Sequence, residues 1–239
     1  MMKIGLITGA NKGIGLETAR QLGALGITTL IGSRDANRGQ EAVAELQKEG
    51  IDAQFLLLDV ADAASIAVAA REVEARFGRL DILINNAASL PIVDRQDAAF
   101  QVSTDVFREI FEVNVFGLHE VTRAFWPLLE KSDAARLVNV SSALGSLKIQ
   151  SEIAPGGHRP TAYGASKAAV NMMTLHYAHQ WAGTPHRANA VHPGGVKTDL
   201  NPQGGLSPAE GAKSSVEMAL IPADGPNGSF THFGETLPW

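Results

Sequence analysis

A tyrosine and a lysine four residues apart are the side chains of this sequence best suited to acid–base chemistry. Tyr163 and Lys167 belong to the run TAYGASK, which opens a segment with the apolar spacing of a helix. Residues four apart share one helical face, so the ammonium is expected one turn from the phenol. A free tyrosine titrates at about pH 10, and one ammonium about 4 Å away supplies about 4 kcal/mol at an effective dielectric constant near 20. Before desolvation is counted, that energy is enough to bring the phenol to about pH 7.

The same spacing also fits an amphipathic helix with a tyrosine at its buried edge and a solvated lysine, and taken alone this interpretation is favoured. The other tyrosine, Tyr177, has Trp181 four residues on and no cation at that spacing. We therefore predict that Tyr177 is a packing residue. The role of Tyr163 depends on the rest of the chain.

The composition excludes several classes of function. The chain has 239 residues, a net charge of −5 and no cysteine. Without a basic run, neither nucleic acid nor a membrane surface is an expected partner. No apolar run approaches the ~20 residues that span a bilayer, and the first residues do not follow the pattern of a secretory signal. The absence of cysteine excludes disulfides, thiolate nucleophiles and cysteine-ligated metals. We expect a cytoplasmic protein.

A glycine-rich turn follows the first apolar run of the chain. Residues 4–8 (IGLIT) have the character of a strand buried on both faces, and residues 9–15 (GANKGIG) lead into helical spacing. In this context glycines let the backbone approach a pyrophosphate, whose charge meets the free N–H groups of the helix start. We predict dinucleotide binding here rather than a plain turn.

Apolar runs and helical segments alternate along the rest of the chain. Strands are predicted at 4–8, 28–33, 53–58, 80–84, 136–141, 187–191 and 229–233, and helices at 16–25, 36–49, 61–77, 104–131, 161–181 and 208–220. Residues 90–103 have no regular pattern. The succession predicts a single α/β domain over residues 1–239, with a Rossmann-type, doubly wound, mostly parallel seven-stranded sheet and helices on both faces.

Several motifs occur in an order that resembles the short-chain dehydrogenase/reductase family over nearly the whole chain. They are the Thr-Gly-x3-Gly-x-Gly turn from Thr8, the run NNAA at 85–88, Ser142 three residues before Gly145, the Tyr-x3-Lys pair, and the Pro-Gly-x3-Thr turn at 193–198. Ala88 departs from the glycine usual in the family. The NKGIG loop, the lengthened stretch before Tyr163 and the run GPNG at 225–228 resemble the carbonyl-reductase branch.

The resemblance implies a catalytic tetrad, which consists of Asn114, Ser142, Tyr163 and Lys167. In the reducing direction, a hydride passes from nicotinamide C4 to a carbonyl carbon while Tyr163 donates a proton to the oxygen. Ser142 polarises that oxygen, Lys167 holds the ribose and tunes Tyr163, and Asn114 orders a water. Strand alternation sends Ser141 and Ser142 to opposite sides, so only one can face the site. Alternatively, Asn114 is a satisfied buried amide.

The resemblance also implies the contacts to the cofactor. They are Gly9, Asn11, Lys12, Gly13, Ile14, Gly15, Ser33, Arg34, Asp59, Val60, Asn86, Ala87, Tyr163, Lys167, Pro193, Gly194, Val196 and Thr198. Asp59 can equally cap the next helix, and Asn86 can be structural, with Asn85 and Ala87 beside the ribose. No metal is expected, because His176 and His179 lack a third ligand at a convincing spacing.

The choice of cofactor depends on the end of the second strand. Ser33 stands where NAD-using relatives carry an acid, and Arg34 and Lys12 place two cations near it. Because arginine binds phosphate in a bidentate manner, these residues favour NADP(H). Asp35 is predicted to be the N-cap of the following helix, although an alignment shifted by one residue would make it the ribose-binding acid.

We therefore expect NADPH-dependent reduction of a small aldehyde or ketone. The alternatives are an NAD-linked dehydrogenase of an alcohol, a sugar or a steroid, and a non-catalytic dinucleotide sensor. Substrate flaps are predicted at 144–160 and 195–215, with residues 201–207 as a candidate lid. A surface insertion is the alternative for residues 147–160. A homo-oligomer is possible, since members of the family often assemble through two long helices.

Overall fold

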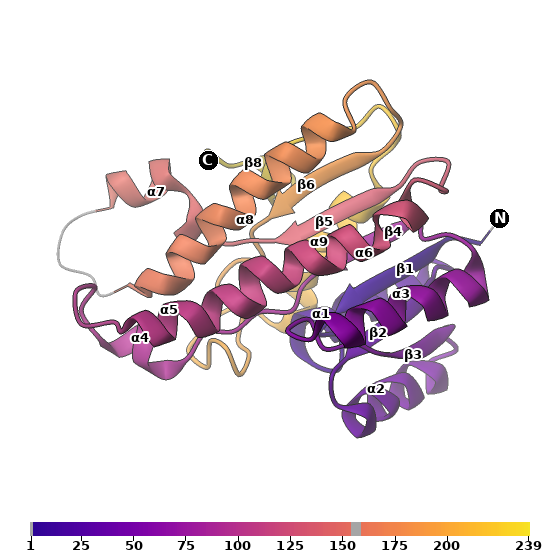
Figure 1. The fold of residues 1–239 in the computed structure, drawn as a ribbon, viewed down its shortest axis with the longest axis horizontal. Helices are drawn as coiled ribbons and strands as arrows, with labels where there is room; N and C mark the ends of the chain where they lie inside the picture. Colours follow the sequence, from indigo (N-terminus) through magenta and orange to yellow (C-terminus); the bar gives the residue numbers. More distant parts are fainter. Residues whose placement is uncertain (1, 154–158) are drawn as a thin grey trace.

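The computed structural model describes residues 2–153 and 159–239, and one continuous sheet runs through it (Figure 1). The strand order is β3-β2-β1-β4-β5-β6-β7-β8. The strands are β1 (Ile4–Thr8), β2 (Thr28–Ser33), β3 (Ala53–Leu57), β4 (Ile82–Asn85), β5 (Arg136–Val140), β6 (Arg187–Val191), β7 (Phe230–His232) and β8 (Glu235–Thr236). All neighbours are parallel except β7 and β8. The predicted doubly wound, mostly parallel sheet is confirmed.

The prediction of seven strands was wrong by one, because β8 was missed. This strand has two residues and pairs antiparallel with β7 through Thr231 and Thr236. Phe233 and Gly234 form the tight turn between them, with φ angles of 45° and 81°. Both values lie in the left-handed region that two-residue hairpins require. A pair of exposed residues gives no apolar pattern, so the sequence did not reveal the strand.

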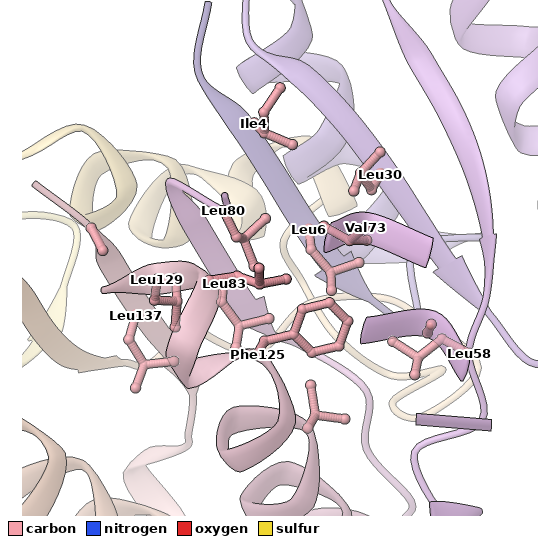
Figure 2. Packing of buried hydrophobic residues seen from close by; sticks show 14 of the residues in the cluster. Ile4, Leu6, Leu30, Leu58, Val73, Leu80, Leu83, Phe125, Leu129 and Leu137 are labelled. Carbon is pink, nitrogen blue, oxygen red and sulfur yellow. The ribbon is translucent and has the colours of Figure 1, made fainter. Parts of the chain in front are cut away.

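Helices cover both faces of the sheet. One face carries α1 (Gly13–Ala24), α2 (Ala36–Lys48) and α9 (Pro208–Leu220), and the other carries α3 (Ala63–Phe77), α6 (Leu118–Leu129) and α8 (Thr161–Gln180). Alternation along β1 sends Leu6 into one core and Ile7 into the other. Figure 2 shows the first of these cores, where Leu6, Leu83 and Phe125 pack together.

Two helical predictions need correction. The segment 90–103, predicted to be irregular, contains the short helix α4 (Ile92–Gln96). The single helix predicted at 104–131 is divided into α5 (Thr104–Phe111), a π-helical segment (Glu112–Gly117) and α6. Gly117 lets this segment approach the loop that follows β3, because a Cβ at Gly117 would lie 2.5 Å from the Val60 carbonyl oxygen. Such π-helical insertions often occur at functional sites.

The two predicted flaps contain regular structure. A 3-10 turn (Ala143–Gly145) and α7 (Leu147–Glu152) occupy much of 144–160, and residues 154–158 lie outside the described chain. In 195–215, α9 begins at Pro208, so only residues 195–207 form a loop. None of the helices in the described parts of the chain combines the length and apolar character needed to cross a bilayer.

Candidate active site

Tyr163 and Lys167 meet on the first two turns of α8, as their spacing predicted. The Lys167 side chain is buried, and its Nζ donates a hydrogen bond to the Val140 carbonyl oxygen at 2.7 Å. The same Nζ lies 5.5 Å from the centre of the Tyr163 ring. Val140 ends β5, so the end of a central strand fixes the ammonium beside the phenol.

The pKa of Tyr163 is shifted in the direction opposite to the one expected. Burial raises it to about 12, and the positive charge of Arg95 on α4 acts against that increase. Burial also lowers the pKa of the Lys167 ammonium to about 8. The shift toward pH 7 held only before desolvation was counted, and desolvation of the phenolate has the larger effect here.

A carboxylate from another segment caps the start of α8. Asp94 of α4 is fully buried, and its two carboxylate oxygens accept hydrogen bonds from the backbone N–H groups of Ala162 (3.0 Å) and Tyr163 (2.8 Å). The residue at the N-cap position, Pro160, offers no side-chain cap. Asp94 therefore satisfies two free donors of the helix that carries Tyr163. The sequence did not reveal this role, because the bond spans 69 residues.

The prediction that Ser141 and Ser142 face opposite sides agrees with their bonds. Ser141 Oγ donates to Asn171 Oδ1 of α8 at 2.5 Å, whereas Ser142 Oγ accepts from Leu144 N–H at 3.2 Å and begins the 3-10 turn. The turn packs tightly on α8, because a Cβ at Gly145 would lie 2.5 Å from the Lys167 carbonyl carbon. The Ser141 hydroxyl is thus bound to an internal side chain, whereas Ser142 lies after the end of β5, beside α8.

Asn114 lies in the π-helical segment and is almost fully buried. Its Nδ2 donates to the Ser89 carbonyl oxygen and to Ser166 Oγ, both at 3.1 Å, and its Oδ1 accepts from Ser89 N–H at 2.7 Å. The side chain therefore joins the loop after β4 to α8. These bonds fit a satisfied buried amide, the alternative raised by the sequence.

The glycine-rich turn leaves the start of α1 open. Lys12 at the N-cap position makes no side-chain cap, so the first N–H groups of the helix keep their bonding capacity for an anion. A Cβ at Gly15 would lie 2.5 Å from Asn86 Nδ2, which explains the glycine. Asn86 Nδ2 donates to the Thr8 carbonyl oxygen at 2.8 Å, so Asn86 braces the turn.

The loop after β6 closes on the same turn. A Cβ at Gly13 would lie 3.5 Å from the Thr198 methyl group, and Lys12 forms an ion pair with Asp199. Gly194 has a φ of 86°, which places the start of this loop in the left-handed region. Pro193 and Val196 are buried, and Val196 packs beside Gly211 of α9. The predicted cofactor contacts at 9–15 and 193–198 are thus brought together.

A pocket lies between the glycine-rich turn and the start of α2. This pocket has a volume of about 440 Å³ and is lined by Asn11, Lys12, Arg38, Glu41, Ala42, Glu45 and Asp199. Arg34 is exposed at the strand end. Asp35 caps α2, since its Oδ1 accepts from Arg38 N–H at 3.1 Å, as predicted. Arg38, which lines this pocket from the first turn of α2, was not among the predicted contacts.

Several of the remaining residues predicted beside the cofactor make hydrogen bonds within the protein. Ser33 is buried, and its hydroxyl donates to the Asp35 carbonyl oxygen at 2.9 Å. Asp59 Oδ1 accepts from Ala61 N–H at 3.0 Å, while Asp62 is the residue that caps α3. Asn85 is buried and donates to Thr122 Oγ1 and Asn139 Oδ1, both at 2.9 Å.

Three other predicted contacts line the same edge of the sheet. Ile14 lies in the first turn of α1, Val60 follows β3, and Ala87 follows β4 with its N–H donating to Thr8 Oγ1 at 3.0 Å. Within the described residues, no group of three or more acidic, histidine or cysteine side chains could hold a metal ion. The rings of His176 and His179 lie 6.4 Å apart on α8.

The chain is similar to known proteins along nearly its whole length. The family model described as short chain dehydrogenase matches residues 3–205. A (+)-neomenthol dehydrogenase from Arabidopsis thaliana is 38% identical, with 94% of each chain covered. The solved salutaridine reductase from Papaver somniferum is 30% identical with a TM-score of 0.83, covering 95% of this chain and 99% of that one. A gluconate 5-dehydrogenase from Burkholderia cenocepacia, solved with NADP and tartrate, is 28% identical with a TM-score of 0.81, covering 96% and 92%. The protein belongs to the short-chain dehydrogenase/reductase family of oxidoreductases.

Proposed function

We propose that this protein reduces an aldehyde or ketone to an alcohol by hydride transfer from NADPH, with Tyr163 as the general acid. The observation that carries the proposal is the meeting of the Tyr163–Lys167 pair with an uncapped glycine-rich helix start at one edge of the sheet. Ligands of doubly wound sheets bind at this edge, outside the carboxyl ends of the strands.

One group of residues would bind the cofactor, and another would transfer the proton. The N–H groups at the start of α1 would hold the pyrophosphate, and Thr198 and Val196 would lie beside the nicotinamide. When bound, the nicotinamide supplies the hydride. Tyr163 stays protonated at neutral pH because its pKa is raised, so the phenol holds the proton that the carbonyl oxygen receives. Lys167, whose pKa of about 8 keeps it mostly charged at pH 7, would stabilise the phenolate that remains.

Ser142 would donate a hydrogen bond to the carbonyl oxygen from the end of β5. Its neighbour Ser141 is committed to Asn171, which leaves Ser142 as the serine available at this strand end. Asn114 would act by joining the loop after β4 to α8, and any water that it orders would complete the proton path.

A preference for NADPH is supported by the cations at the end of β2. Arg34 is exposed, and Arg38 lies one helical turn on, with its Nε 3.4 Å from Asp35 Oδ2. Since Asp35 is occupied as the cap of α2, it is poorly placed to bind ribose hydroxyls as it would in an NAD enzyme. The relative from Burkholderia cenocepacia was solved with NADP, which supports the same choice.

The first test measures consumption of NADPH with a panel of aldehydes and ketones. We expect turnover by the wild type. No oxidation of NADPH with any carbonyl compound would overturn the proposed reaction.

The second test measures cofactor preference with Arg34→Ala. Loss of a charge-assisted phosphate contact is expected to weaken NADPH binding by about 10-fold or more and to leave NADH binding within about 2-fold. Arg71→Ala is the matched control, because Arg71 is also exposed and lies on α3. Equal weakening of both cofactors by Arg34→Ala would contradict the assignment to NADP(H).

A further inference from the structure

Arg95 is an arginine whose charge the fold leaves unused. Its Nε is fully buried and has no hydrogen-bond partner. Across residues 2–153 and 159–239, no hydrogen bond or ion pair links Arg95 to another side chain. Arg34 and Arg71 also have no such partner there, but both are exposed to solvent. Arg95 is therefore distinguished among the described arginines by combining a buried donor with the absence of a partner.

Among the described residues, Arg95 makes no ion pair with the adjacent acid. Both carboxylate oxygens of Asp94 accept backbone hydrogen bonds at the start of α8, and one of the donors is Tyr163 itself. These two hydrogen bonds to the backbone fix α4 against the first turn of α8, the helix that carries Tyr163. Arg95 follows directly in the chain, so its position beside that turn is fixed as well. Figure 1 shows α4 and the beginning of α8 at the same end of the molecule.

Arg95 acts electrostatically on Tyr163. The largest effect on the pKa of Tyr163 is burial, which raises it, and the opposing effect is the charge of Arg95. The guanidinium thus lies within electrostatic range of the phenol that would hold a substrate carbonyl.

An unpaired cation in such a place is unfavourable. Arginine cannot lose its proton in a protein, and the buried Nε–H of Arg95 lacks the acceptor that would offset its desolvation, although the residue as a whole is only half-buried. A planar guanidinium suits a carboxylate, which accepts two parallel N–H bonds. A substrate that brings a carboxylate would therefore satisfy Arg95 at the moment it binds.

We propose that Arg95 binds a carboxylate carried by the substrate, and that the substrates are accordingly carbonyl compounds with an acid group near the carbonyl. This inference rests on the proposed carbonyl reduction. Tyr163 and Ser142 receive the carbonyl oxygen, and α4 receives the acid group.

The test compares a keto acid with its neutral ester, using benzoylformate and methyl benzoylformate as the probes with NADPH. For the wild type, we expect kcat/KM to be at least about 10-fold higher for the acid, since charge-assisted bonds of this kind correspond to about 10- to 100-fold. Arg95→Gln should lower kcat/KM for the acid by about 10-fold or more, mainly through KM. The same variant should leave the ester within about 3-fold, and Arg95→Lys should fall between the two.

Arg159→Gln is the matched control. Arg159 also lies near the start of α8, but its guanidinium already donates to Gln150 Oε1 at 3.2 Å. It should leave the ratio of acid to ester unchanged. Thermal unfolding of each variant checks that the fold is retained.

Two outcomes would overturn the inference alone. In the first, the wild type reduces both probes but does not prefer the acid. In the second, Arg95→Gln lowers kcat/KM for the acid and the ester alike, which would assign Arg95 to the tuning of Tyr163. If no carbonyl compound is reduced by the wild type, the proposed function itself fails, and that result is distinguishable from both.

Discussion

The two ends of α8 each carry a tyrosine, and the two side chains share one property and differ in another. Burial raises the pKa of both Tyr163 and Tyr177 to about 12. The Tyr177 hydroxyl lies 2.8 Å from His119 Nδ1, and its ring packs against Trp126 with centroids 5.9 Å apart. Tyr163 has the Lys167 ammonium 5.5 Å from its ring centre. In the described residues its hydroxyl has no hydrogen-bond partner.

Burial does not distinguish the proposed acid, Tyr163, from Tyr177. Desolvation acts on both phenols in the same direction, so it cannot account for different roles. The difference lies in the neighbouring Lys167 ammonium and in a hydroxyl for which the described residues supply no hydrogen-bond partner. The spacing of Tyr163 and Lys167 was informative because it placed a cation near one phenol, not because it lowered the pKa of that phenol.

The largest expected effect comes from removing each hydroxyl in turn. Tyr163→Phe should lower kcat for carbonyl reduction by about 10²- to 10⁴-fold, the usual contribution of a general acid. Tyr177→Phe should leave kcat within about 2-fold and lower the free energy of unfolding by about 1 kcal/mol, because His119 loses its partner. Steady-state kinetics and urea unfolding measure the two quantities.

Undiminished activity in Tyr163→Phe would remove the general acid from the proposed mechanism. A comparable loss of kcat in Tyr177→Phe would show that the two ends of α8 do not differ as described. Binding of NADPH to each variant serves as the control for an intact cofactor site.

Local patterns explain why much of the site was predictable. The glycine turn, the Asp35 cap and the opposite orientations of Ser141 and Ser142 follow from spacing within a few residues. The chemistry at the start of α8 was harder to foresee. Asp94 reaches Tyr163 across 69 residues in a segment without a regular pattern, and no local rule predicts that contact.

The sign of the pKa shifts and the π-helical segment also could not be predicted from the sequence. The sequence gives the distance between Tyr163 and Lys167 along a helix, but it does not give the depth of burial that decides the sign of the pKa shift. The π-helical segment around Asn114 was equally hidden, because its apolar spacing continues that of the helices on either side. Such features depend on packing between segments and not on propensity.

Asp94 tests whether the cap at the start of α8 also positions Tyr163 for proton transfer. Asp94→Ala should lower the free energy of unfolding by about 2 kcal/mol, because two N–H groups at the helix start lose their acceptor. It should also lower kcat by about 10-fold, since a small displacement of Tyr163 misaligns proton transfer. Urea unfolding and kinetics with a neutral carbonyl substrate provide the measurements.

The control for Asp94 is Asp62→Ala, which removes the cap of α3. Asp62 accepts a hydrogen bond from Ala64 N–H at 2.9 Å, and α3 lies apart from the predicted tetrad in the sequence and packs on α6. We expect a loss of stability of about 1 kcal/mol with unchanged kcat. If both variants lose stability and neither loses activity, Asp94 is only a helix cap.

The smallest expected effect concerns the pH dependence of stability. Burial lowers the pKa of Lys167 to about 8 in the folded protein, below its ordinary value of 10.5. Between these values the unfolded chain binds more protons than the folded protein, so the free energy of unfolding should rise with pH. The Lys167 contribution to this rise is about 1 kcal/mol between pH 7 and pH 9. The raised pKa of Tyr163 acts in the opposite direction only above pH ~10, where the unfolded phenol ionises.

Urea unfolding at pH 7 and pH 9 tests this sign with two lysine variants. Lys167→Met should remove the contribution, so its stability should rise by about 1 kcal/mol less than that of the wild type over the same interval. Lys48→Met changes an exposed lysine in the last turn of α2 and should keep the full rise. An identical pH dependence in all three proteins would mean that the Lys167 ammonium is not desolvated. The cation beside Tyr163 would then be an ordinary solvated lysine, and the contrast between the two ends of α8 would rest on the free hydroxyl alone.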